Sequence, residues 1–209
     1  MGKRKIGNAL KGKFGDVQLA VESDMLGACR SLSGKSHGIV CILGTGSNAC
    51  YYDGDTIIEN SPALGYVLGD YGSGNMIGRK LLHDYLGKRM DDESKKLFES
   101  TFQETLNEVL SKTYQQNRPA AYLASFSQFV GEHQNHPYYY LLAYNAFKEF
   151  VENDILFLRQ GKGQPIHFTG SVAHYFSNIL RKVGTDMNVH VKNIVQSPIA
   201  GLTLFHQFS

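Results

Sequence analysis

The stretch from residue 38 to residue 78 most constrains the fold, because it sets an apolar run, a tight glycine turn and a second glycine-rich loop in close succession. Residues 39–43 are all apolar and rich in β-branched side chains, which is typical of a strand buried on both faces. Gly-Thr-Gly-Ser-Asn follows at 44–48. Glycines let backbone N–H groups approach an anion, and hydroxyls add donors. The pattern predicts a phosphate-binding turn formed by Gly44, Thr45, Gly46 and Ser47.

The remaining pattern predicts a single order of strands and helices. Three strands are followed by a long helical region, and then by a strand, a helix and a strand. This order is that of a ribonuclease H-like lobe. A further strand and a helix that begins near Asp24 precede it. The predicted strands are 17–21, 38–44, 47–53, 56–59, 165–170 and 189–195, and the predicted helical segments are 74–90, 91–117, 119–130, 138–158 and 174–182.

The composition limits the classes of protein to which this chain can belong. The chain has 209 residues, of which 42% are hydrophobic, so it can bury one substantial core. A formal net charge of +2 is too small to argue for a nucleic-acid partner. No apolar stretch approaches the roughly 18 to 20 residues of a membrane span, and no signal peptide is evident. Three cysteines without a Cys-x-x-Cys pair fit a reducing cytoplasm and argue against an iron–sulfur cluster.

Four short segments carry a family resemblance. They are Ser23-Asp24 with Gly27-Ala28, GTGSN at 44–48, GYVLGDYGSG at 65–74 and FTGSVA at 168–173. In this order they resemble the N-acetylglucosamine kinase-like branch of the acetate and sugar kinase, Hsp70 and actin superfamily. That branch also contains the ATPases that activate 2-hydroxyacyl-CoA dehydratases. The resemblance extends over nearly the whole chain.

The resemblance implies an α/β protein built from ribonuclease H-like, actin-like ATPase lobes. Residues 36–209 would form the C-terminal lobe, with a helical insertion over about 75–158, and residues 1–35 a remnant of a second lobe. Family members carry an Asp-Gly-Gly-Gly-Thr-type first phosphate loop, and no such turn precedes Asp24. We therefore expect a truncated, catalytically impaired chain, whose exposed strand edge at 17–21 favours a homodimer.

The resemblance also implies roles for individual residues. Asp24 would be the general base that accepts the proton of a sugar hydroxyl. Asp70 would accept hydrogen bonds from sugar hydroxyls, and Tyr71 stands where the family pattern has Glu. The other sugar-binding residues would be Asn48, Gly65 and Tyr66, and the adenosine wall would be Gly170, Ser171 and Val172.

Purely structural explanations remain open for the same residues. Asp24 could be a helix N-cap, and GTGSN a plain hairpin turn. Residues 69–74 could be an ordinary strand-to-helix connection, and the small residues at 170–173 could serve helix packing. His133 and His136 lack a third ligand, so no metal site is predicted from the side chains of the chain itself.

The expected function is ATP-dependent phosphorylation of an amino sugar such as N-acetylglucosamine, with Mg²⁺ on the nucleotide and no nucleic-acid or membrane partner. Phosphoryl transfer depends mostly on holding the phosphate, the metal and the acceptor hydroxyl in line. Two alternatives stay open. The chain could be a partner-activating ATPase of the dehydratase-activator type, or a non-catalytic ligand-binding domain.

Overall fold

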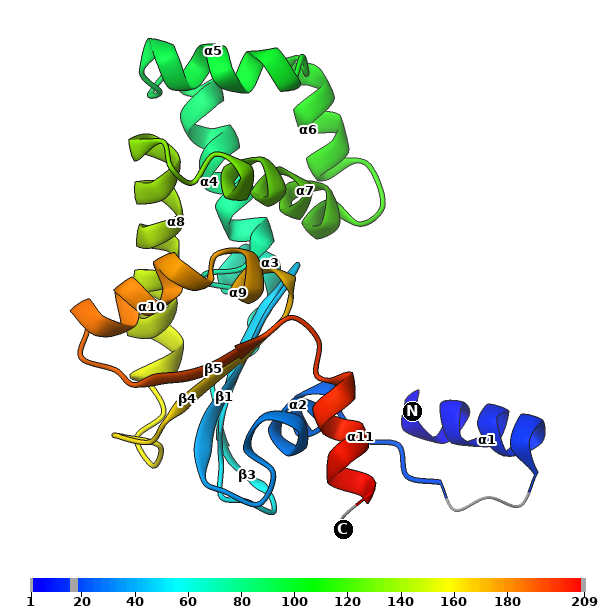
Figure 1. The fold of residues 1–209 in the computed structure, drawn as a ribbon. Coiled ribbons are helices and arrows are strands. Elements are labelled where there is room, and N and C mark those ends of the chain that lie inside the picture. The colour runs from blue at the N-terminus through cyan, green and yellow to red at the C-terminus, as the bar shows by residue number, and fades with distance from the viewer. Residues whose placement is uncertain (1, 16–18, 208–209) are drawn as a thin grey trace.

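The structure is a computed structural model that describes residues 2–15 and 19–207. A five-stranded sheet lies at the centre, and a group of helices extends beyond one end of it (Figure 1). The strands are β1 (Gly38–Leu43), β2 (Ser47–Tyr52), β3 (Ile57–Asn60), β4 (Ile166–Thr169) and β5 (Val191–Val195). The helices are α1 (Gly2–Phe14), α2 (Asp24–Ser33), α3 (Gly65–Leu68), α4 (Gly74–Leu86), α5 (Asp92–Thr101), α6 (Leu106–Tyr114), α7 (Pro119–Glu132), α8 (Pro137–Phe150), α9 (Ser171–Tyr175), α10 (Ser177–Asp186) and α11 (Ile199–Gln207), and a π-helical turn, η1 (Val151–Ile155), follows α8.

The sheet has the order β3-β2-β1-β4-β5. β1, β2 and β3 form an antiparallel meander, whereas β4 and β5 run parallel to β1. Leu43 pairs with Ser47, so residues 44–46 make the hairpin turn between β1 and β2. The strands predicted from residue 38 onward are confirmed, with ends that differ by a few residues.

β1 is buried on both faces, as its apolar run predicts. Cys41 and Leu43 face the larger core, which the helices from α4 to α10 complete. Val40 faces a smaller core on the opposite side, where it packs with Met25 and Cys29 of α2. The sheet is therefore covered on both sides, which explains why its central strand carries no polar alternation.

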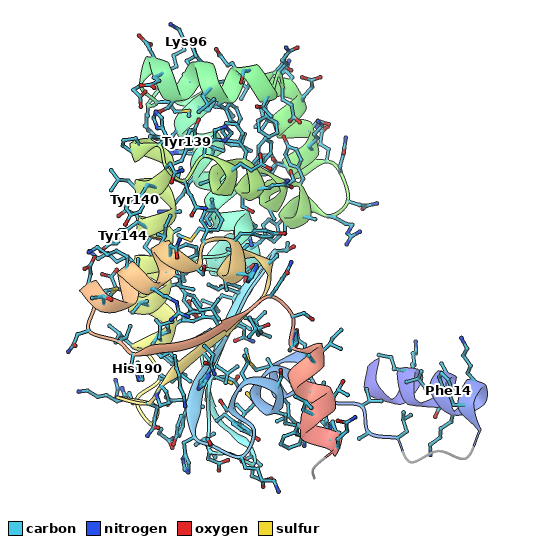
Figure 2. The ribbon with its side chains drawn as sticks, in the orientation of Figure 1. Phe14, Lys96, Tyr139, Tyr140, Tyr144 and His190 are labelled. Atoms are coloured by element: carbon cyan, nitrogen blue, oxygen red, sulfur yellow. The ribbon has the colours of Figure 1, made fainter. Side chains whose placement is uncertain are left out.

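The helical group is held together by close backbone packing and by caps. A Cβ at Gly78 of α4 would lie 1.8 Å from the Leu123 carbonyl oxygen of α7. The backbones of the two helices can therefore pack this closely only because residue 78 is a glycine. The predicted helical segment 91–117 is two helices, because Thr105 and Glu108 form a capping box that starts α6. Tyr139 is fully buried between these helices and donates to the Ser94 carbonyl at 2.8 Å (Figure 2).

The first part of the chain departs from prediction. The strand expected at 17–21 is wrong for residues 19–21, which lie in no strand, and residues 17 and 18 lie outside the described residues. A strand needs a hydrogen-bonded neighbour, and no described strand runs beside 19–21. Helix α11 was not expected, and it packs on α2. No described helix is long and apolar enough to cross a membrane.

Candidate functional site

The loops that follow β1, β4 and β5 meet at one edge of the sheet. A Cβ at Gly170 would lie 2.2 Å from the Leu43 carbonyl oxygen, so the loop after β4 presses on the end of β1. The Gly170 N–H donates to the Val195 carbonyl at 3.2 Å, which links the same loop to β5. These are the carboxyl ends of three parallel strands, where open α/β sheets bind their ligands.

The predicted phosphate turn is joined to the loop before α4 by backbone and side-chain hydrogen bonds. The Gly74 N–H donates to the Gly44 carbonyl at 2.8 Å. The Asn75 N–H and its side-chain amide both donate to the Thr45 carbonyl, at 3.1 Å and 2.7 Å. Segments about thirty residues apart in the sequence therefore form one rigid unit.

Asp70 is the second connection between these loops. Its Oδ1 accepts from the Ser47 N–H at 3.3 Å, and its Oδ2 accepts from the Asn75 amide at 2.9 Å. Its backbone lies in the left-handed region, with φ of 55°, a conformation that Asp adopts more readily than most residues. The carboxylate is therefore held by two N–H donors beside the phosphate turn.

Asn75 was missed by the sequence reasoning. It is fully buried, its amide bridges Thr45 and Asp70, and its Oδ1 has no hydrogen-bond partner among the described residues. An amide directly after Gly-Ser-Gly at a helix start was the signal available in the sequence. Ser73, not Asp70, caps α4, since its side chain accepts from the Met76 N–H.

The turn retains donors that could face an anion. The Gly44 N–H donates to the Gly46 carbonyl and the Ser47 N–H donates to Asp70, so both are occupied. The N–H groups of Thr45 and Gly46 have no partner within the described parts of the chain. Together with the two hydroxyls of the turn, they are the groups that could bind a phosphate.

The remaining predicted sugar-binding residues lie in β2 and at the start of α3. Asn48 is half-buried, and its Oδ1 accepts from the Ala49 N–H at 2.9 Å. Gly65 starts the short helix α3 with φ of 73°, and the Tyr66 carbonyl accepts from Arg79 at 3.0 Å. Tyr71 packs against the core, so the residue in the family's Glu position is half-buried.

A cavity of about 470 Å³ lies between α7 and α9. Ser171 and Val172 line it, as does Tyr175, which is 63% exposed. Gln128 of α7 lines the other side. Two of the three predicted adenosine residues therefore border a cavity, and the third, Gly170, forms the turn just before α9.

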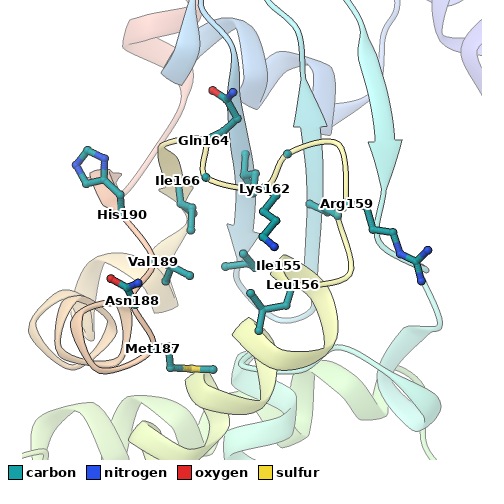
Figure 3. A pocket seen from close by; sticks show the side chains of 14 residues that line it. Ile155, Leu156, Arg159, Lys162, Gln164, Ile166, Met187, Asn188, Val189 and His190 are labelled. Carbon is teal, nitrogen blue, oxygen red and sulfur yellow. The ribbon is translucent and has the colours of Figure 1, made fainter.

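A larger cavity of about 780 Å³ opens at the opposite end of the sheet (Figure 3). It is lined by Ile39 and Ile166, which lie near the starts of β1 and β4, and by Lys162 and His190. None of the predicted site residues lines it. We place the candidate site at the carboxyl ends of the strands, because the glycine-rich loops converge there.

Asp24 is not connected to these loops by any hydrogen bond in the described residues. Ser23 is the N-cap of α2, accepting from the Leu26 N–H at 3.2 Å, so the reading of Asp24 as the cap is wrong. Asp24 is the first helical residue, exposed, and its Oδ1 accepts from the Met25 N–H at 2.8 Å. An exposed carboxylate at a helix start is free to meet a ligand.

Asp154 is a buried carboxyl that the sequence reasoning did not identify. It lies in η1, is 7% exposed, and hydrogen-bonds the Ser61 hydroxyl. Burial is the main cause that raises its pKa to about 6; Ser61 opposes the rise and the charge of Asp70 adds to it. A π-helical turn was not readable from sequence, although such turns occur often at functional sites.

Comparison with solved structures places the chain among known folds. A protein of Porphyromonas gingivalis described as a "putative N-acetylglucosamine kinase" superposes with a TM-score of 0.93 at 35% sequence identity, over 98% of this chain and 72% of that one. The chain belongs to the same sugar kinase family. A second protein with that description, from Chromobacterium violaceum, is 16% identical with a TM-score of 0.72 over 97% of this chain and 71% of its own, and shares the fold. No protein-family model and no curated protein matches this sugar kinase chain.

Proposed function

We propose that this sugar kinase-family chain phosphorylates an amino sugar, with N-acetylglucosamine as the leading substrate and ATP as the phosphoryl donor. The observation that carries the proposal is the unit made by the phosphate turn and Asp70, held together by Ser47 and Asn75. The description of the Porphyromonas relative supports the choice of sugar. We further propose a ribonuclease H-like lobe over 36–209, which the strand order supports.

Asp70 is suited to hold the sugar. A carboxylate has about four lone-pair sites, and Asp70 uses two of them for the Ser47 N–H and the Asn75 amide. The remaining sites can accept from two adjacent ring hydroxyls. Asn48, Gly65 and Tyr66 would border the same subsite.

ATP would be bound by two neighbouring parts of the site. Its phosphates would meet the N–H groups of Thr45 and Gly46 and the Ser47 hydroxyl. Its adenosine would enter the cavity that Ser171 and Val172 line, with Gly170 close beside it. Tyr175, largely exposed at that cavity, is placed to stack on a base. When bound, ATP supplies the γ-phosphoryl group.

The proposed reaction also needs a general base and a metal ion. Asp24 would be the general base for the sugar hydroxyl, and its exposure at the start of α2 supports this. The described residues contain no group of three or more His, Cys, Asp and Glu that could hold a metal ion. Mg²⁺ would be carried by the phosphates of ATP.

A coupled ADP-release assay with ATP, Mg²⁺ and N-acetylglucosamine tests the proposal. We expect sugar-dependent release that Asp70→Asn and Asp24→Asn each reduce, and that Asp92→Asn, an exposed control on α5, leaves unchanged. ATP turnover that ignores the sugar would instead favour a partner-activating ATPase. Sugar or ATP binding by calorimetry without turnover would favour a ligand-binding domain. Slow turnover, a homodimer and a cytoplasmic location stay predictions.

A further inference from the structure

The start of α4 fixes two consecutive carbonyl groups of the phosphate turn. The Gly74 N–H donates to the Gly44 carbonyl at 2.8 Å. The Asn75 N–H donates to the next carbonyl, that of Thr45, at 3.1 Å. The side-chain amide of Asn75 adds a second hydrogen bond to the same Thr45 carbonyl, at 2.7 Å. Both carbonyl groups of the turn therefore point toward α4.

The planar peptide bond converts these carbonyl directions into N–H directions. No described peptide bond is cis, and in a trans peptide the C=O of one residue and the N–H of the next point in opposite directions. Because the Gly44 carbonyl points toward α4, the Thr45 N–H points away from it. Because Asn75 holds the Thr45 carbonyl, the Gly46 N–H also points away from α4. These are the two N–H groups of the turn that have no partner within the described residues, and Thr45 is exposed.

The amide nitrogen of Asn75 also holds Asp70. Asn75 Nδ2 donates to Asp70 Oδ2 at 2.9 Å, so its two N–H bonds are divided between the turn and the carboxylate. The orientation of the amide follows from these partners, because the reversed amide would set its oxygen against two acceptors. The side chain is fully buried, so bulk water does not compete for either hydrogen bond.

The Asn75 side chain is not needed to form α4. Ser73 is the N-cap and accepts from the Met76 N–H, and the backbone hydrogen bonds to the turn require no particular side chain. Asn75 Oδ1 is buried without a hydrogen-bond partner in the described residues, which costs free energy. A residue that served helix stability alone would avoid this cost. The contacts to Thr45 and Asp70 are therefore what the side chain contributes.

We propose that Asn75 is a positioning residue that couples the phosphate and sugar subsites: its amide directs the Gly46 N–H toward a phosphate group and holds the Asp70 carboxylate toward the sugar. The inference rests on the proposed function and deepens it. A phosphate bound to the Gly46 N–H polarises the peptide that carries the Thr45 carbonyl, which strengthens the hydrogen bond from Asn75. The amide is then held more firmly beside Asp70, so each ligand raises the affinity for the other.

Side-chain amide NMR of the ligand-free protein tests the positioning without any assumption about substrate. The two Asn75 amide proton signals, assigned with Asn75→Ser, should respond differently to Asp70→Asn. The proton that faces Asp70 should move upfield because it loses a charged acceptor, and the proton that faces Thr45 should stay. Asn145→Ala, at an exposed position on α8, should move neither signal. An Asn75 amide that does not respond to Asp70→Asn would overturn the proposal.

Calorimetry tests the coupling. N-acetylglucosamine binding is measured with and without saturating ADP and Mg²⁺. In the wild type and in Asn145→Ala, ADP should raise the sugar affinity by about fivefold or more. In Asn75→Ala the sugar should bind about tenfold more weakly, because Asp70 loses a hydrogen bond that holds it, and ADP should no longer raise the affinity. An equal ADP effect in the wild type and Asn75→Ala, or none in the wild type, would refute the coupling.

Asn75→Ser keeps the test decisive if Asn75→Ala does not fold. A serine hydroxyl has one O–H donor, so it cannot hold Thr45 and Asp70 at once. This variant should therefore fold and lose the ADP effect, and retention of the effect would contradict the proposal. If the wild type binds neither ADP nor sugar, the proposed function fails, and the NMR measurement on the ligand-free protein still decides the role of Asn75.

Discussion

Gly46 lies against the carboxylate of Asp70, so that a Cβ at Gly46 would be 2.9 Å from Asp70 Oδ2. Glycine is needed here for space rather than for an unusual backbone angle, since Gly46 is not among the glycines with positive φ. The contact explains why the second glycine of the turn and the aspartate of the next loop occur together. Each would have to move if the other changed.

Gly46→Ala should therefore separate the two loops. We expect a loss of about 1 to 2 kcal/mol in the free energy of unfolding, because a Cβ would overpack this contact, and weaker sugar binding as Asp70 moves. Gly44→Ala is the matched control, since no atom lies within 4 Å of a Cβ at Gly44. Chemical denaturation measures the difference, and equal stability of the two variants would contradict the geometry.

Gly78→Ala should be more damaging than any other Gly→Ala change discussed here. Its Cβ would meet the Leu123 carbonyl oxygen at 1.8 Å, which forces α4 and α7 apart. We expect a loss of about 3 kcal/mol or more, at the upper end of overpacking effects. In Gly27→Ala the new Cβ would be 3.7 Å from Leu202, so this helical position should gain about 0.5 to 1 kcal/mol. Thermal unfolding that ranks the two variants the other way would refute this packing.

Asp154→Asn should stabilise the protein at neutral pH. The native pKa of about 6 lies above the ordinary value of 3.8, so the folded state holds a proton that the unfolded state has lost. Wild-type stability should therefore fall as pH rises from about 4 to 6. The shift corresponds to about 3 kcal/mol at most, which the variant should recover above pH 6. Urea unfolding at pH 4 and pH 7 checks whether the difference between the two proteins grows with pH.

His167 should produce the opposite pH dependence. Burial lowers its pKa to about 4 from 6.5, with Lys192 and His190 adding to the effect. Its Nδ1 accepts from the Asn193 amide at 3.2 Å, which suits a neutral ring. Below pH 6.5 the unfolded state takes up a proton that the folded state refuses, so stability should fall by up to about 3 kcal/mol toward pH 4.

His167→Gln tests this assignment through the slope of stability against pH rather than through its absolute value, because the substitution also disturbs packing. The slope between pH 6.5 and pH 4 should flatten in this variant. His206→Gln, at an exposed position on α11, should leave the slope unchanged. An unaltered slope in His167→Gln would show that other groups carry the acid sensitivity.

The glycine-rich loops could be located from the sequence because their signals are local. The apolar run at 39–43 predicts β1, and the glycines that follow it predict the turn. The helix start at Asp24 was nearly right, although the cap is Ser23. By contrast, the strand at 17–21 was expected from alternation alone, and alternation does not show whether a neighbouring strand is present to pair with it.

The sequence by itself determined the strands from residue 38 onward and the turn at 44–47, because neighbouring residues set backbone propensity and capping. The candidate role of Asp70 came from the family resemblance of its loop. Only the tertiary structure decided that Asn75 bridges Thr45 and Asp70, and that the side chain of Asp154 in η1 is buried. These relationships join residues far apart in the chain, and their distances follow from how α4, α8 and η1 pack on the sheet. Packing of this kind depends on the fit of many side chains at once, which no local pattern records.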